Sequence, residues 1–299
     1  MPSQERLTRW LIGGPPWLYL LLLFVAPTLI MVAASFGWPG AEGGLAPLLL
    51  RDAQGLHFDL TLDNYTDLAA TTLYAWLFLK SLAYAVVVTL CCLILAYPLA
   101  LTIAKSPKRW RNALLLLVIL PFWSNFLVRI YAWMIILGPQ AGLSRLVNGV
   151  LAWLHLEPVS LLFSPFAVLI GLIYVHLPFM ILPLYANLEK HDPALLDAAR
   201  DLGAKPWQCF WQITFPLSRP GVIAGAILVF IPALGAFAVP DILGGTSGIM
   251  IGNVIKMQFL EARDWPFGSA LSIVMTILVL ALTAAAAWAA RRAGGRIYD

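Results

Sequence analysis

Charged residues are scarce in this chain of 299 residues. Only 11% of its residues are Asp, Glu, Lys or Arg, whereas 61% are hydrophobic, and the mean hydropathy is +0.84. Soluble globular domains carry about 25% charged residues. The low charge content therefore excludes a soluble domain of this length and indicates a protein embedded in a membrane.

The sequence also lacks the residue patterns of several function classes. It has no G-x-x-x-x-G-K-[ST] phosphate loop, no H-E-x-x-H and no G-x-S-x-G, so no ATPase, metalloprotease or hydrolase site is expected. Its three cysteines have neither a disulfide framework nor a metal-binding spacing. We therefore expect no enzyme activity, no catalytic residue, no metal and no cofactor.

Long charge-poor runs divide the sequence into segments. A helix needs about 20 apolar residues to span a bilayer. We expect an all-α integral membrane protein, one domain over 1–299, with six spans at about 17–36, 81–104, 113–137, 165–187, 219–239 and 268–290. A cleaved signal peptide is the alternative for the first span, but its apolar run is longer than a signal peptide needs.

Basic and acidic residues lie in alternate connections between these spans. Lys and Arg gather near both ends of the chain and in the connections that precede the third and fifth spans. Because cytoplasmic connections carry the excess of Lys and Arg, both termini are expected in the cytoplasm. The same asymmetry accounts for the net charge of +4, so we expect no nucleic-acid partner.

One polar stretch, between the fourth and fifth spans, carries strong helix signals. Asp192 is a favourable N-cap residue, and Pro193 occupies the first helical position. A stripe of apolar residues follows at helical spacing: Leu195, Ala198, Ala199 and Leu202. Gly203 is placed to end the helix, and Lys205-Pro206 begins a second short one. An ordinary amphipathic helix at the membrane interface is one interpretation.

The same stretch resembles the EAA loop of the permease subunits of binding-protein-dependent ABC importers. The matching residues are Asp197-Ala198-Ala199, Gly203, Ile213 and Phe215-Pro216, with Asp197 and Phe215 where the family has Glu and Leu. The resemblance implies a type I ABC importer permease fold whose loop 190–218 holds a coupling helix for a cytoplasmic ATPase. It implies these coupling residues: Leu195, Leu196, Asp197, Ala198, Ala199, Arg200, Gly203, Ile213 and Pro216.

Two further stretches resemble the spermidine/putrescine type of these permeases, one from Pro121 to Trp133 and one from Val239 to Pro266. The resemblance implies a multi-pass protein of the bacterial inner membrane. Its implied partners are membrane lipid, a second permease subunit, two copies of the ATPase and a periplasmic binding protein that delivers polyamines. Relatives also handle ferric ion, sulfate-type anions and opines, so another small solute, such as an amino-acid-like compound, is the alternative cargo.

A stand-alone channel or carrier and a membrane enzyme are interpretations from other classes. The six predicted spans contain no Asp or Glu, which argues against a proton- or sodium-coupled carrier. The same absence leaves a cationic cargo without a buried counter-ion. Three alternatives follow: the path is filled with water and binds the cargo weakly, a partner subunit supplies the acidic residues, or the cargo is not a cation.

Polar and aromatic residues at membrane depth are candidates for the translocation path. A charge such as Arg129 costs about 2.5–3.5 kcal/mol there, so it either lines the path or snorkels outward. Aromatic faces and carboxylates bind polyamine cations, although Trp and Tyr also favour membrane interfaces. His176 is either a protonation switch or a neutral side chain bonded to a neighbouring helix. The candidate path residues are Trp123, Asn125, Arg129, Tyr131 and Asp241.

Overall fold

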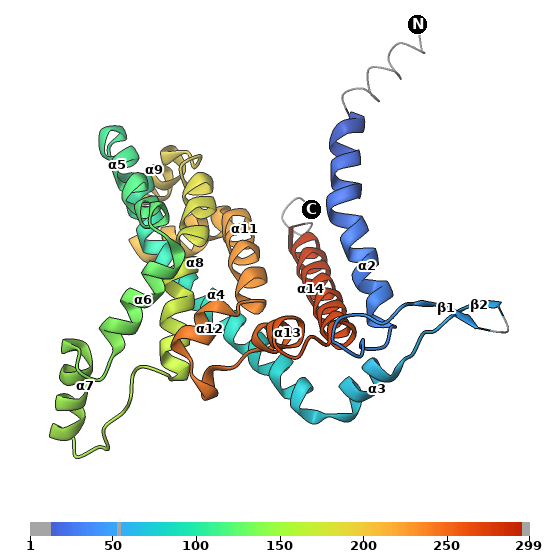
Figure 1. The fold of residues 1–299 in the computed structure, drawn as a ribbon. Helices are drawn as coiled ribbons and strands as arrows, with labels where there is room; N and C mark the ends of the chain where they lie inside the picture. Colours follow the sequence, from blue (N-terminus) through green and yellow to red (C-terminus); the bar gives the residue numbers. More distant parts are fainter. Residues whose placement is uncertain (1–12, 53–54, 295–299) are drawn as a thin grey trace, which may run out of the picture. The chain divides into compact units, whose positions relative to one another are not determined.

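The computed structural model describes residues 13–52 and 55–294, and the regular elements within these residues are helices and one short hairpin (Figure 1). Six segments are long and apolar enough to cross a membrane: Gly13–Ser35, Thr72–Lys105, Phe126–Trp153, Pro165–Leu188, Pro206–Leu234 and Trp265–Ala285. The helical class and the count of six confirm the fold expected from the sequence. The chain divides into two compact units, residues 1–76 with 254–299, and residues 77–253.

Two apolar helices form the body of the first unit. Helical residues 13–20 continue through a π-helical turn, η1 (Leu21–Val25), into α2 (Ala26–Ser35). The last helix, α14 (Trp265–Gly294), packs beside α2 (Figure 1). The unit also holds α3 (Asp63–Ala70) and most of α13 (Ile251–Leu260).

The end of α2 is fixed by two neighbouring side chains of α3. The amide nitrogen of Asn64 donates to the carbonyl oxygens of Ser35 and Gly37, both at 3.0 Å. The hydroxyl of Tyr65 donates to the Ser35 hydroxyl at 2.7 Å. Because a helix leaves its last carbonyls unpaired, the Asn64 contacts satisfy groups that would otherwise need water.

A β-hairpin in the first long connection departs from the all-helical expectation. Strand β1 (Leu49–Asp52) pairs antiparallel with β2 (Gly55–Phe58), with Leu49 opposite Phe58. The sequence contains only four residues per strand and no clear alternation, so the pattern gave no signal for it.

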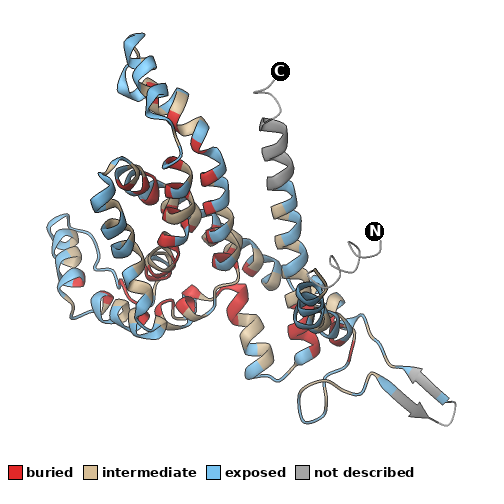
Figure 2. Cartoon of the chain, turned by 90° about the horizontal axis from the view of Figure 1, so that it is seen from above, coloured by how far each residue is buried: buried red, intermediate tan, exposed pale blue. Residues whose placement is uncertain are grey.

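The second unit contains the remaining helices. They are most of α4 (Thr72–Lys105), α5 (Lys108–Ile119), η2 (Leu120–Trp123), α6 (Phe126–Leu137), α7 (Gly142–Trp153), α8 (Pro165–Leu188), α9 (Pro193–Asp201), α10 (Pro206–Cys209), η3 (Phe210–Thr214), α11 (Phe215–Leu234), α12 (Ala238–Leu243) and η4 (Thr246–Gly248). Buried residues gather on the sides where these helices pack, and the outward sides are largely exposed (Figure 2). Exposed apolar side chains are expected where helices face hydrocarbon.

Helices α8 and α11 form the central pair of this unit. Two glycines spaced four residues apart, Gly221 and Gly225, allow the close approach. A Cβ on Gly225 would lie 2.6 Å from the sulfur of Met180, and one on Gly221 would lie 2.7 Å from Cβ of Asn187. Small residues at this spacing are a common device for packing membrane helices.

The segment predicted as one span over 113–137 is interrupted. Helix α5 ends at Ile119, η2 follows, and Ser124 has extended backbone before α6 begins at Phe126. Pro121 has no N–H to continue the α-helical bonding, which accounts for the break. The sequence contained this signal, but the apolar run on both sides concealed it.

Candidate functional site

Helix α9 begins as the sequence predicts. The carboxylate of Asp192 accepts a hydrogen bond from the backbone N–H of Ala194 at 3.0 Å, and Pro193 occupies the first position. This cap satisfies one of the four N–H groups that a helix start leaves unpaired.

Helix α9 ends just before Gly203, whose backbone has a positive φ of 81°. The Gly203 N–H donates to the carbonyl of Arg200 at 2.8 Å, and the Ala204 N–H donates to the carbonyl of Ala199 at 3.0 Å. These two bonds are those of a Schellman motif, which usually needs glycine. A Cβ on Gly203 would meet no atom within 4 Å, so only the backbone conformation requires glycine there.

The apolar stripe of α9 lies largely uncovered. Leu195 is 48% exposed and Leu202 is 89% exposed, while Ala198 is exposed and Ala199 is half-buried. Beside the stripe, Arg200 and Asp197 form an exposed ion pair at 3.1 Å. A short helix with capped ends and uncovered leucines is a surface suited to a protein partner.

The second short helix predicted at Lys205-Pro206 is continuous with the fifth span. Helix α10 runs through the π-helical turn η3 into α11, so residues from Pro206 to Leu234 form one unbroken helical rod. Ile213 lies in η3, and Pro216 lies in the first turn of α11. The turn at residues 202–205 joins α9 to this helix.

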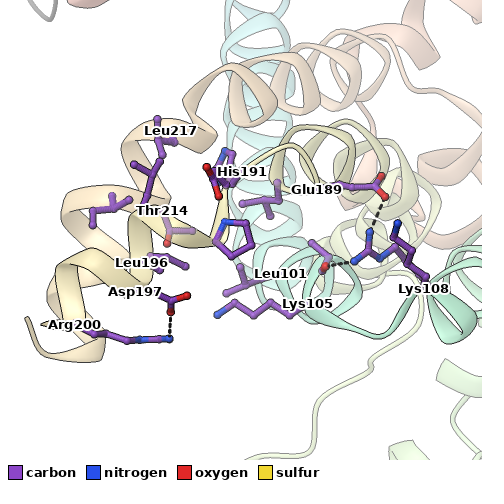
Figure 3. A pocket seen from close by; sticks show the side chains of 17 residues that line it. Leu101, Lys105, Lys108, Glu189, His191, Leu196, Asp197, Arg200, Thr214 and Leu217 are labelled. Atoms are coloured by element: carbon purple, nitrogen blue, oxygen red, sulfur yellow. Dashed lines mark hydrogen bonds and ion pairs between the residues drawn. The ribbon is translucent and has the colours of Figure 1, made fainter.

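A cavity of about 490 Å³ lies behind α9 (Figure 3). Helix α9 contributes Pro193, Leu195, Leu196, Asp197 and Arg200 to its wall. The end of α4, the start of α5, the end of α8 with the residues that follow it, and the η3–α11 helix complete the wall with Leu101, Ala104, Lys105, Lys108, Arg111, Leu188, Glu189, His191, Asp192, Ile213, Thr214 and Leu217. Of the predicted coupling residues, Leu195, Leu196, Asp197, Arg200 and Ile213 thus line one cavity.

Arg111 joins the ends of two spans at this cavity. Its guanidinium donates to the Glu189 carboxylate at 2.7 Å and to the carbonyl of Ala104 at 2.8 Å. Hydrogen bonds from Tyr185 and then from Arg111 lower the pKa of Glu189. Glu189 is the C-cap residue of α8, and Ala104 lies in the last turn of α4. The sequence indicated Arg111 only as a marker of orientation, because its partner lies 78 positions away.

The predicted path residues do not form one cluster. Asn125 is the N-cap of α6, and its side chain accepts from the N–H of Leu127 at 2.8 Å. Its side chain therefore caps the start of α6. Trp123, on the preceding turn, is 75% exposed, and Tyr131 is exposed as well.

Arg129 lies against aromatic rings. Its guanidinium carbon is 4.9 Å from the centroid of Phe122 and 5.9 Å from that of Phe126. Its buried Nε has no hydrogen-bond partner among the described residues. This cation–π arrangement offsets part of the cost of a charge at that depth. The sequence analysis considered only two possibilities for Arg129, that it lines the path or that it snorkels outward.

Asp241 belongs to a polar network at the start of α12. Its carboxylate accepts a hydrogen bond from the side-chain amide of Asn253, which also donates to the carbonyl of Phe237 at 3.0 Å. Helix α12 packs against α6, so Asp241 and the aromatic stretch of α6 belong to neighbouring elements. Asn253 belongs to the stretch that resembles the family, but the sequence did not indicate its contact with Asp241, because the two residues lie 12 positions apart with a turn between them.

A second cavity, of about 360 Å³, lies between α6, α8 and the turn that joins α11 to α12. Its wall includes Phe126, His176, Pro232 and Phe237, and none of the five predicted path residues. His176 is buried, and its Nδ1 donates to the carbonyl of Leu172 in its own helix at 2.7 Å. The bond to a neighbouring helix that was considered for His176 is therefore not the one observed.

Comparison with known proteins places most of the chain in one group. Residues 96–297 match the family model described as the inner membrane component of binding-protein-dependent transport systems. The chain is 46% identical over 276 residues to the spermidine/putrescine transport system permease protein PotB of Escherichia coli K12, covering 92% of this chain and 94% of that one. The PotB protein of Haemophilus influenzae is 43% identical over 88% of this chain and 87% of its own length.

A solved structure shows the same fold at lower identity. A chain of a bacterial ABC transporter involved in the import of the acidic polysaccharide alginate superposes with a TM-score of 0.70. The match covers 97% of this chain and 98% of that chain, at 19% sequence identity.

Proposed function

The chain belongs to the family of inner-membrane components of binding-protein-dependent transport systems, and we propose that it is the permease subunit of a polyamine ABC importer. The observation that carries this proposal is α9, a capped helix with uncovered leucines that is joined through one rod to a membrane span. The putrescine and spermidine cargo is supported by the two spermidine/putrescine permeases that are 46% and 43% identical to this chain.

The proposed partner at α9 is a cytoplasmic ATPase. Leu195 and Leu202 would enter an apolar cleft of that partner, and Ala198 would permit close approach because its side chain is small. The Asp197–Arg200 pair lies at the edge of the same surface and would contribute mainly to specificity. Leu196 and Ile213 face the cavity and are proposed as support for the helix.

Energy for transport is proposed to come from two copies of that ATPase, since the sequence has no phosphate loop of its own. A second permease subunit would complete the path, and a periplasmic binding protein would deliver the cargo. We propose that α9, α5 and both termini lie on the cytoplasmic side, which is supported by the basic residues of the connections that hold these helices.

The proposed mechanism is a lever. Closure of the ATPases on ATP displaces α9, and the continuous helix from Pro206 to Leu234, which follows α9 in the same unit, carries the displacement along the fifth span. Because Gly221 and Gly225 hold α11 tightly against α8, the two helices are expected to move as one body. The importer then alternates between inward-open and outward-open states, and ATP biases the equilibrium between them.

For the translocation path we propose Trp123 and Tyr131, whose rings are exposed, as the surface that contacts the cationic cargo. Arg129 would limit the dwell time of a polycation by repulsion. Asn125 and Asp241 are proposed to shape the path through the helix start and the α12 network that they hold.

Reconstitution tests the proposal. The full importer in proteoliposomes, with binding protein and ATP, is expected to accumulate radiolabelled putrescine or spermidine. Leu202→Glu should abolish both ATPase association and uptake, whereas Leu62→Glu, at a leucine that is 62% exposed in the first unit, should leave both intact. Uptake by liposomes that hold this chain alone would refute the importer and favour a stand-alone channel or carrier.

A further inference from the structure

We propose that the cavity behind α9 binds a phosphate-bearing anion. Its side chains come from α4, α5, α8, α9 and the η3–α11 helix, and Figure 3 shows basic residues on two sides of the same space. The proposal that this face is cytoplasmic rests on the orientation given above, whereas the binding site itself rests on the residues that line the cavity.

The acidic residues of the cavity already have partners. Glu189 accepts from Arg111 at 2.7 Å, and Asp197 accepts from Arg200 at 3.1 Å. Asp192 accepts the N–H of Ala194 as the cap of α9. These contacts neutralise two carboxylates and occupy the third.

Two ammonium groups of the wall are without a bonded partner in the described ranges of the chain. Lys105 ends α4 and Lys108 begins α5, and both line the cavity. Among the residues that the structure describes, neither forms a hydrogen bond or an ion pair, although Lys108 lies close enough to Glu189 to stabilise its charged form. Counting four Lys and Arg against three Asp and Glu, the wall has a net charge of 4 − 3 = +1 with His191 neutral.

His191 provides a further unsatisfied group. Its Nε2 is buried and has no hydrogen-bond partner within the described part of the chain. A buried polar atom without a partner destabilises the fold, so a ligand that bonds to it gains affinity by satisfying it. When Nε2 carries the hydrogen of the imidazole ring, it can donate a hydrogen bond to an anion.

Phosphate is the anion that matches this set of donors. Lysine is a common phosphate ligand as a point charge, and an imidazole N–H adds a directed hydrogen bond. Basic pockets at the cytoplasmic ends of membrane helices bind phospholipid headgroups, and a free phosphate or phosphate ester presents the same oxygens. An anion there would sit between α9 and the ends of α4 and α8, where it would stiffen the lever.

The experiment uses the full-length chain in nanodiscs, without cargo, ATP or partner subunits. In one arm, native mass spectrometry measures retention of phosphatidylglycerol over phosphatidylcholine. In the other, nanodiscs of phosphatidylcholine alone are tested for binding of radiolabelled inorganic phosphate. Saturable binding in either arm supports the site, and the arm that responds identifies the source.

Variants locate the anion. The double variant Lys105→Gln with Lys108→Gln is expected to lower the affinity about tenfold, since two charge-assisted contacts are lost. Lys105→Arg with Lys108→Arg should retain binding, which shows that the fold is intact. The matched control, Arg109→Gln with Lys190→Gln, removes the same charge from neighbouring residues outside the cavity and should leave the affinity unchanged.

An equal loss in the cavity variant and in the control would overturn the proposal, because general surface charge would then explain the binding. Absence of saturable binding in both arms would overturn it as well. Neither result bears on transport, because the assay contains no ATPase and no cargo. A failure of polyamine uptake, in turn, leaves this assay unaffected.

Discussion

Helix α9 and the α8–α11 pair differ in how closely they pack against the rest of the chain. Gly221 and Gly225 bring α11 so close to α8 that a single added carbon would clash with Asn187 or Met180. Around Gly203, at the end of α9, the space is open, and Leu202 is 89% exposed. One region is fixed by contacts within the chain. The other has capped ends and leaves much of its apolar face exposed.

The two regions should therefore contribute to different properties, one to the stability of the folded permease and the other to its coupling with a partner. Substitutions in the α8–α11 pair should damage the folded permease itself. Substitutions in α9 should leave the permease folded and impair its communication with a partner. The predictions below test that separation, beginning with the largest expected effect.

Gly225→Ala is expected to destabilise the second unit by about 1–3 kcal/mol, because overpacking forces the helices apart. Thermal unfolding in detergent measures the change. The control is Gly149→Ala in α7, where an added Cβ meets no atom within 4 Å and alanine favours the helix. Equal unfolding temperatures for the two variants would show that the helices are not tightly packed.

Gly203→Val is expected to lower uptake about 5- to 150-fold, the usual range of a coupling free energy between two sites. A β-branched residue is strained at a φ of 81°, so the end of α9 would change shape without a steric clash. Gly203→Asn tolerates that φ and should retain most of the uptake. Thermal stability of the isolated chain should stay near that of the wild type in both variants, and a collapse in stability would contradict the separation.

Asp192→Ala removes the N-cap of α9 and should weaken that helix by about 1 kcal/mol. Hydrogen exchange of the α9 amides is then expected to accelerate about fivefold, while the amides of α8 keep their protection. Asp192→Asn still accepts the Ala194 N–H and serves as the control. Faster exchange throughout α8 would mean that α9 is not an independent element.

The smallest effect concerns the Arg111–Glu189 pair. The pKa of Glu189 is lowered in the folded state by Tyr185 and Arg111, so the pair stabilises the protein above the pKa of the unfolded carboxyl. That contribution is lost as the pH falls through the lowered pKa. The difference in unfolding temperature between wild type and Glu189→Gln should therefore be constant at neutral pH and shrink only below about pH 4.3. Glu157→Gln, at an exposed residue, controls for general charge, and a shrinkage already at neutral pH would refute the pair's role.

Much of the transport interpretation was available before the structure. Charge scarcity and run length determine six membrane helices, because hydrocarbon tolerates neither bare backbone nor free charge. Asp192, Pro193 and Gly203 determine where α9 begins and ends, because caps act within a few residues. The resemblance of loop 190–218 added the family, which the matches over 96–297 and over 92% of the chain confirm.

Other features depended on partners distant in sequence. Arg111 meets Glu189 across 78 positions, and Asn253 meets Asp241 across a turn. The hydrophobic pattern also did not reveal the break at Pro121, nor that α10 and α11 form one continuous helix. An apolar run has the same pattern whether its helix is continuous or broken.

The sequence by itself determined the number of membrane helices, their class, and the local bounds of α9. Only the tertiary structure decided that Lys105, Lys108 and His191 line one cavity and that α11 touches α8 at Gly225. The physical reason is one of range. Hydropathy, capping and backbone conformation act on residues within a turn or two of one another, whereas cavities and close helix contacts form only when segments far apart in the chain pack together.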